Sequence, residues 1–223
     1  MTQTTSKPRK RFTWQRLAMD IARIVCAPLL LVYRMRRLTP EGKKYTQHIQ
    51  GGAILAANHT TFADPFLIGV AVWYRRLYFL AAEVVMKGKL RCFLLKGVGA
   101  IKIDRNAADI EAMHKSVNVL KQGYLLSIFP QGGISESEQI ETLKSGVVLI
   151  ALQAGVPIIP MHVIPAKHWY SRRTVIIGEP LDPKTYIQKK FPSTADIENI
   201  TRKLMEEMNR CAALTQGVRT CKL

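Results

Sequence analysis

The chain has few cysteines, few acidic residues and no long apolar run at its N-terminus. Its four cysteines are scattered without a Cys-x-x-Cys unit, so neither a zinc site nor a disulfide framework is indicated, and a reducing compartment fits best. The uncharged run at 24–33 is ten residues long. At about 1.5 Å per residue it covers roughly half of a hydrocarbon core of about 30 Å, too little to span a bilayer. Low-complexity tracts and repeats are also lacking, which argues against global disorder.

Basic residues outnumber acidic ones. The chain has 33 Lys and Arg and 16 Asp and Glu, which gives a formal net charge of +17. Such a field attracts a polyanion: nucleic acid, an anionic membrane or a phosphorylated ligand. The alternative is a solvated basic surface. The 223 residues, 48% of them hydrophobic, suffice for one full-sized core.

The first forty residues are basic, with Asp20 as their only acid. Apolar residues between Trp14 and Leu29 recur at three- and four-residue steps, which predicts a helix with one apolar stripe, kinked near Pro28. This pattern favours a helix lying in the interface of an anionic membrane, and the alternative is a helix packed on the protein's own core. We therefore predict a membrane-associating segment at 1–38 and one folded domain at 39–223.

Beyond residue 50, short apolar runs alternate with segments of helical periodicity. Strands are predicted at 53–57, 77–81, 99–103, 124–129, 156–164 and 174–177. Helices are predicted at 83–96, 143–154 and 194–214, and two more are predicted to begin at Asp64 and after a cap at Asn106. This alternation predicts an α/β fold, with a mostly parallel central sheet flanked by helices. In such folds the functional site lies at the carboxyl ends of the strands.

The first strand-end loop contains His59 and Asp64, five residues apart. A folded turn there would bring the carboxylate to one ring nitrogen and leave the other for a substrate, which makes a general base. The alternatives are that Asp64 only caps a helix and that His59 is an ordinary loop residue.

Two further loops carry polar residues or glycines. Lys102 lies in the strand predicted at 99–103. Arg105 follows just past the end of that strand, where its guanidinium could hold a phosphate or simply pair with the neighbouring Asp104. A third loop has two glycines after a strand, which permit close backbone approach to a ligand or form a plain turn. Its residues of interest are Pro130, Gln131, Gly132 and Gly133, followed by Lys144 further along the chain.

Four segments stand out, in this order along the chain: Asn58–Asp64 (His-x4-Asp), Gly99–Arg105, Phe129–Ser135 and Val156–Pro160. Together they resemble the glycerolipid acyltransferase family, which includes 1-acyl-glycerol-3-phosphate acyltransferases. They span about a hundred residues, and four motifs in order make a specific signal.

The resemblance implies an O-acyltransferase that moves a fatty acyl group from acyl-CoA or acyl carrier protein to a lysolipid hydroxyl in phospholipid biosynthesis. In it, His59 would deprotonate the hydroxyl, Asp64 would orient the imidazole, and backbone N–H groups near Gly132 or Gly133 would face the oxyanion. No metal or other cofactor and no nucleic acid is expected. The remaining substrate-binding residues would be Asn58, Lys102, Arg105, Pro130, Gln131 and Lys144.

The third segment departs from the family pattern. Gln131 stands where the family has Glu, Gly133 where it has Thr, and Ile134 where it has Arg. The family uses basic residues here to hold the acceptor's phosphate, so three acceptors stay open: lysophosphatidic acid, another lysophospholipid and a non-phosphate lipid. A membrane-binding protein with little activity on the same scaffold is a further alternative. The expected location is peripheral or monotopic, on the cytoplasmic face of a membrane.

Overall fold

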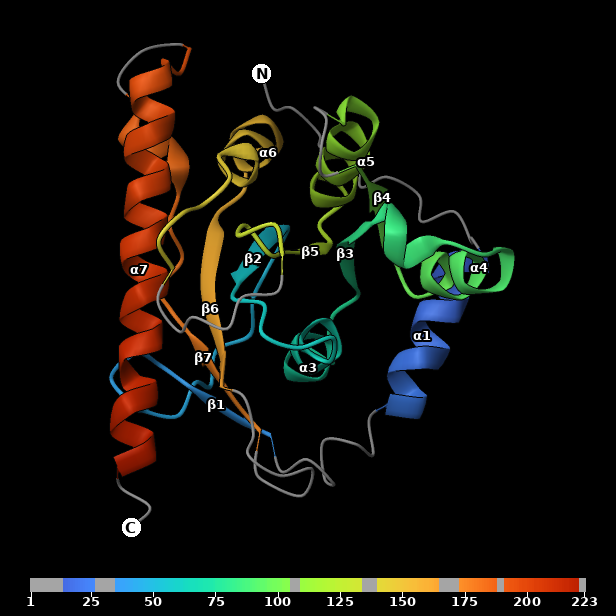
Figure 1. Cartoon of the computed structure of the whole chain (residues 1–223), viewed down its shortest axis with the longest axis horizontal. Coiled ribbons are helices and arrows are strands. Elements are labelled where there is room, and N and C mark those ends of the chain that lie inside the picture. Colours follow the sequence, from blue (N-terminus) through green and yellow to red (C-terminus); the bar gives the residue numbers. More distant parts are fainter. Residues whose placement is uncertain are drawn as a thin grey trace, which may run out of the picture.

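The structure is a computed structural model that describes residues 14–26, 35–104, 109–133, 140–164, 173–187 and 191–220. Its centre is a seven-stranded sheet in the order β1-β7-β6-β2-β5-β3-β4, in which only β6 and β7 pair antiparallel (Figure 1). The strands are β1 (Arg36–Leu38), β2 (Ala53–Ala57), β3 (Leu77–Ala82), β4 (Ala100–Ile103), β5 (Leu125–Ile128), β6 (Ile158–Ile164) and β7 (Thr174–Ile177). The predicted mostly parallel α/β fold is confirmed.

Helices cover both faces of this sheet. The described helices are α1 (Trp14–Cys26), α3 (Asp64–Ala71), α4 (Lys89–Gly97), α5 (Ile110–Lys121), α6 (Gly146–Ala154) and α7 (Thr194–Thr220), with 3₁₀ turns η1 (Glu83–Met86) and η2 (Pro183–Tyr186). Helices α5, α6 and α7 pack on one face and α3 on the other, while α1 and α4 lie together beyond the β4 edge (Figure 1). None of the described helices is both long and apolar enough to cross a membrane.

Strand β2 lies in the middle of the sheet and is buried along its whole length. Ile54 and Ala56 point into the core under α5, α6 and α7, whereas Leu55 and Ala57 point into the core under α3. This two-sided burial explains why the segment reads as a continuous apolar run rather than an alternating one. It also fixes the carboxyl end of β2, where His59 follows.

The helix predicted at 83–96 is interrupted. Gly88 has φ +93°, which cannot continue a helix, so the chain forms η1, turns at Lys87–Gly88 and starts again as α4. The next helix is capped by Asp109, whose carboxylate accepts a hydrogen bond from the Ala112 N–H. The predicted cap, Asn106, lies outside the described residues.

The sheet begins earlier than the predicted domain. Residues Arg36–Leu38 form β1, which pairs with β7, and the Leu38 side chain is buried. The predicted boundary at residue 38 therefore falls at the end of an edge strand. Sequence reasoning missed this strand because three residues rich in arginine carry no apolar periodicity.

Candidate active site

His59 and Asp64 meet in the loop that joins β2 to α3. The Nδ1 atom of His59 lies 3.3 Å from Oδ2 of Asp64, at the long end of hydrogen-bond range, and both side chains are buried. Because Nδ1 faces the carboxylate, Nε2 is left on the opposite side of the ring as the nitrogen that can accept a proton. The two residues are brought together as the His-x4-Asp spacing predicted.

Asp64 is held by its own loop. Its Oδ2 accepts hydrogen bonds from the backbone N–H groups of Thr60 (2.6 Å) and Thr61 (2.7 Å), and its Oδ1 accepts one from the Thr61 hydroxyl (2.8 Å). Burial on its own would raise the pKa of this carboxyl, but the hydrogen bonds from His59, Thr61 and Thr60 outweigh it and the pKa is lowered. Asp64 therefore stays ionised beside the imidazole.

Asp64 is not the N-cap residue of α3, which was the alternative interpretation from the sequence. Ala63 precedes the first residue of α3, and no side chain caps the helix. Asp64 sits in the first helical turn, and its carboxylate turns back into the loop towards Thr60 and Thr61 rather than along the helix. Pro65, at the start of the helix, has no N–H to satisfy there.

Asn58 anchors the other end of the same loop. Its amide nitrogen donates to the Val163 carbonyl (3.1 Å), and its amide oxygen accepts from the Val163 N–H (2.7 Å). The side chain is buried, with both polar groups engaged by β6. This geometry suits a residue that fixes the His59 loop to the sheet, and the substrate contact proposed for Asn58 from the sequence stays a prediction.

The third loop lies against the first, since the His59 ring stacks on Phe129 with 4.3 Å between centroids. Pro130 is buried, and its carbonyl accepts a hydrogen bond from the Lys144 N–H (2.9 Å). The Gly132 N–H donates to the Phe129 carbonyl (3.1 Å) in a tight turn. That donor is occupied, which leaves the Gly133 N–H as the other oxyanion donor predicted from the sequence.

Lys144 and Gln131 also belong to this loop region. A Cβ built on Gly132 would lie 2.9 Å from Cε and 3.3 Å from Nζ of Lys144, so the lysine stem runs over the glycine turn. The buried Oε1 of Gln131 accepts no hydrogen bond from the described residues. Two of the predicted polar groups thus gather at the carboxyl end of β5.

Lys102 is not part of this cluster. It lies on β4, three strands from β2, which corresponds to roughly 14 Å at about 4.8 Å per strand. Its ammonium is exposed and donates to Glu83 (2.5 Å), a contact that raises the pKa of the lysine. Its predicted partner Arg105 lies outside the described residues.

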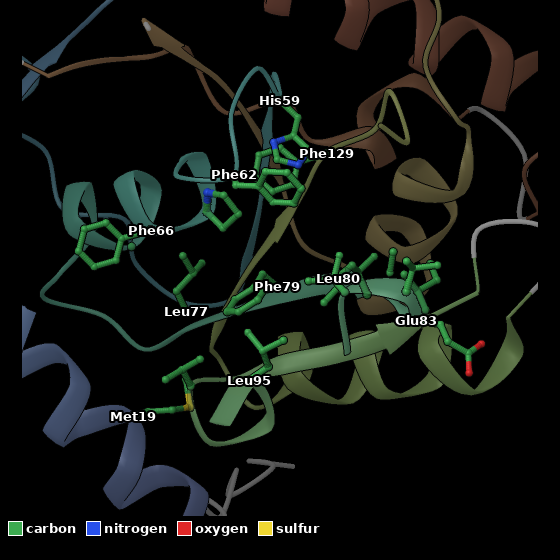
Figure 2. A pocket seen from close by; sticks show the side chains of 18 of the residues that line it. Met19, His59, Phe62, Phe66, Leu77, Phe79, Leu80, Glu83, Leu95 and Phe129 are labelled. Carbon is green, nitrogen blue, oxygen red and sulfur yellow. The ribbon is translucent and has the colours of Figure 1, made fainter. Parts of the chain in front are cut away.

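A largely apolar pocket of about 1110 Å³ opens beside His59. Figure 2 shows His59 and Phe129 at one end, and Met19 and Leu95 at the other. Sequence reasoning missed this pocket, although one signal was present. Aromatic residues lining it recur at helical spacing in and around α3, namely Phe62, Phe66 and Trp73, all of them exposed.

Comparisons with known proteins identify the family. A family model described as Acyltransferase matches residues 37–164, more than half of the chain, and the chain belongs to this family. It is an O-acyltransferase, as the resemblance predicted.

Curated relatives carry two kinds of name. A 1-acyl-sn-glycerol-3-phosphate acyltransferase of Bacillus subtilis is 24% identical over 71% of this chain and 82% of that protein. A protein of the same name from Streptococcus pneumoniae is 28% identical over 70% of this chain and 59% of that protein. A lyso-ornithine lipid O-acyltransferase of Pseudomonas aeruginosa is 29% identical over 48% of this chain and 41% of that protein.

The fold also matches a solved structure. The crystal structure of a 1-acyl-sn-glycerophosphate acyltransferase from Thermotoga maritima aligns with a TM-score of 0.54 and 20% sequence identity, covering 87% of this chain and 79% of that one. This likeness supports the α/β architecture described above.

Proposed function

We propose that this enzyme transfers a fatty acyl group from acyl-CoA or acyl carrier protein to the hydroxyl of a lysophospholipid, with 1-acyl-glycerol-3-phosphate as the leading acceptor, in phospholipid biosynthesis. The observation that carries the proposal is the buried His59–Asp64 pair in the wall of an apolar pocket. The pair supplies a base, and the pocket supplies a place for an acyl chain that excludes water.

In the proposed step, Nε2 of His59 takes the proton of the acceptor hydroxyl while that oxygen attacks the thioester carbonyl carbon. Asp64 accepts the Nδ1–H and stabilises the imidazolium that forms. The carbonyl π electrons move to oxygen, and the Gly133 N–H is the proposed donor to that oxyanion. When the oxyanion collapses, the C–S bond breaks and the thiolate leaves. A thiol of pKa about 8.5 is a good leaving group, and the imidazolium then returns its proton to the thiolate or to solvent.

The pocket fits the acyl chain better than a headgroup. Its lining side chains are largely aliphatic or aromatic, and the charged ones are Arg75, Glu83, Lys87 and Asp104. Its volume of about 1110 Å³ lies just above the range of about 300–1,000 Å³ common for small-molecule sites, as a long flexible chain requires. A chain seated there would bring the thioester carbonyl to His59.

Lys144 is the proposed contact for an acceptor phosphate, because its stem lies over the Gly132 turn next to the Phe129–His59 stack. A second candidate is an acceptor without a phosphate. It is favoured by Gln131 and Ile134 in place of the family's charged residues, and by similarity to a protein named for a lyso-ornithine lipid.

Helix α1 supports association with a membrane. Trp14, Ile21 and Ile24 lie along one side of the helix and are exposed, whereas Met19 points into the pocket. The apolar stripe therefore faces away from the protein, as an interfacial helix requires. With a net charge of +17, an anionic leaflet is the expected surface, and we propose a peripheral or monotopic location on the cytoplasmic face of a membrane.

The test incubates purified enzyme with labelled acyl-CoA or acyl carrier protein and a panel of lysolipids with and without phosphate, with products identified by mass. We expect His59→Ala to lower turnover by about 10²–10⁴-fold, which is the usual contribution of a general base. His114→Ala, on the remote helix α5, is the matched control. Full turnover by His59→Ala, or no acyl product with any acceptor, would overturn the proposal. A preference for phosphate-free acceptors would select the second candidate.

A further inference from the structure

Helix α4 is unusual because none of its nine residues is buried. Leu90, Phe93 and Leu94 are 72%, 65% and 57% exposed, and their three- and four-residue spacing places them on one face. Such a contiguous apolar face on a helix marks a surface that meets something other than water. The opposite side carries Cys92 and Leu95, which pack towards the sheet.

Cations flank this face on both sides. At 100° per residue, Lys89 and Lys96 lie along one border of the apolar face and Arg91 along the other, and all three are exposed. Helix α4 contains no acidic residue. An apolar stripe bordered by Lys and Arg is the pattern of a helix that lies in the plane of an anionic membrane surface.

The surface continues onto α1. The two helices lie side by side (Figure 1) and meet at a small-residue contact, where a Cβ on Gly97 would be 3.8 Å from that of Ala18. Asp20 of α1 forms a hydrogen-bonded ion pair with Arg76, which directly precedes β3 (Nε to Oδ1, 2.9 Å). This contact holds α1 against the end of the sheet. The apolar stripe of α1, already assigned to the membrane, is therefore held next to α4.

The same two helices also contribute residues that line the pocket. Met19 of α1 and Leu95 of α4 line the end of the pocket that is far from His59 (Figure 2), and Val98, which follows α4, is also a lining residue. One set of side chains thus faces the pocket, while Leu90, Phe93 and Leu94 face outwards. The two helices therefore separate the pocket from that outer surface, and a lipid held in the pocket would lie directly beneath them.

We infer that Leu90, Phe93 and Leu94, with Lys89, Arg91 and Lys96, form a second membrane-contact site, which docks α4 beside α1 on an anionic bilayer and sets the pocket at the lipid interface. The inference rests on the proposed function only in assuming that the pocket holds the acyl chain, and the contact between α4 and the membrane does not depend on it. A bilayer fits better than a second copy of the chain, because a two-fold contact would press the same three cations against each other. Nucleic acid would not bury three large apolar side chains.

The test measures sedimentation of the full chain with vesicles of phosphatidylcholine alone or mixed with phosphatidylglycerol. The apolar variant Leu90→Ser/Phe93→Ser/Leu94→Ser is expected to lose binding to both vesicles by about tenfold or more. The cation variant Lys89→Gln/Arg91→Gln/Lys96→Gln is expected to lose about tenfold or more on anionic vesicles alone, with a weaker dependence on salt. Matched controls are Ile110→Ser/Leu149→Ser and Lys115→Gln/Lys121→Gln/Arg202→Gln.

A second measurement places α4 directly. In Phe93→Trp, the fluorescence added over wild type should be quenched by brominated lipids, and an unquenched signal overturns the inference. Wild-type affinity in the apolar variant also overturns it. So does a dimeric wild type that the apolar variant makes monomeric, since the face would then join two copies. His59→Ala should bind vesicles as wild type does, so loss of acyl transfer and loss of docking are separate results.

Discussion

The imidazole ring of His59 stacks on the phenyl ring of Phe129, with planes 25° apart. His59 follows β2 and Phe129 follows β5, and these strands are direct neighbours in the sheet. Asp64 holds one ring nitrogen, and Phe129 holds the plane of the ring. The proposed base, His59, is therefore oriented by two contacts that come from two separate loops.

Replacing Phe129 tests the second contact. Aromatic stacking contributes about 0.5–1.5 kcal/mol, so Phe129→Leu should lower kcat by roughly 2–13-fold if that energy orients the ring. Because leucine keeps an apolar wall, KM for the acyl donor should change less than kcat. Phe129→Tyr keeps the ring and is the control. Equal kcat in the leucine and tyrosine variants would show that the stack has no catalytic effect.

Asp64→Asn tests the buried carboxylate. The amide cannot accept all the hydrogen bonds that Asp64 receives from Thr60, Thr61 and His59, so we expect a loss of about 1–3 kcal/mol of folding free energy near neutral pH. It also favours the wrong tautomer of His59, so activity should fall by about 10³–10⁴-fold.

The pH dependence of this loss follows from the sign of the shift. The pKa of Asp64 is lowered on folding, so its stabilisation is complete above the unfolded carboxyl pKa of about 3.9 and disappears as pH falls through the folded value. Urea unfolding of wild type and Asp64→Asn should therefore differ most near neutral pH and converge in acid. A difference that persists unchanged in acid would mean that the charge of Asp64 is not responsible.

Replacing Gly52 or Gly69 by alanine should change the free energy of unfolding in opposite directions. A Cβ on Gly52 would lie 2.2 Å from the Leu120 carbonyl oxygen, so Gly52→Ala should cost about 3 kcal/mol or more. A Cβ on Gly69, within α3, meets only Leu77 at 3.9 Å, so Gly69→Ala should stabilise by about 0.5–1 kcal/mol through helix propensity. Denaturant midpoints report both, and a stable Gly52→Ala would contradict the close approach of the two chain segments.

Cys211 should make the fold sensitive to alkali. Burial raises the pKa of its thiol to about 12, whereas the unfolded thiol titrates near 8.5. The unfolded state therefore loses its proton first, and stability should fall between these values by about 1.4 kcal/mol per pH unit. In Cys211→Ala the part of the slope that Cys211 contributes should be absent, although the variant is less stable at neutral pH. Parallel urea midpoints from neutral to alkaline pH in both proteins would contradict the prediction.

The geometry of the His59–Asp64 loop was largely predictable from the sequence, because it depends on residues close along the chain. His59 and Asp64 are separated by one turn, and the buried strand before them is visible as an apolar run. The interruption at Gly88 was not predicted, since a single glycine within a helical pattern is usually tolerated. The strand Arg36–Leu38 was not predicted either, because its pairing with β7 is a contact between distant segments.

The sequence by itself determined the alternation of strands and helices, the order of the four motifs and the pairing of His59 with Asp64, because hydrophobic periodicity and local spacing encode them. Only the tertiary structure decided which polar residues share a site. It placed Lys144 beside the Gly132 turn, bound both polar groups of Asn58 to Val163 and set Lys102 at the edge strand. It also formed the apolar pocket and turned the apolar face of α4 outwards. These features depend on strand order and helix packing, and strand order is set by pairing between segments far apart in the chain.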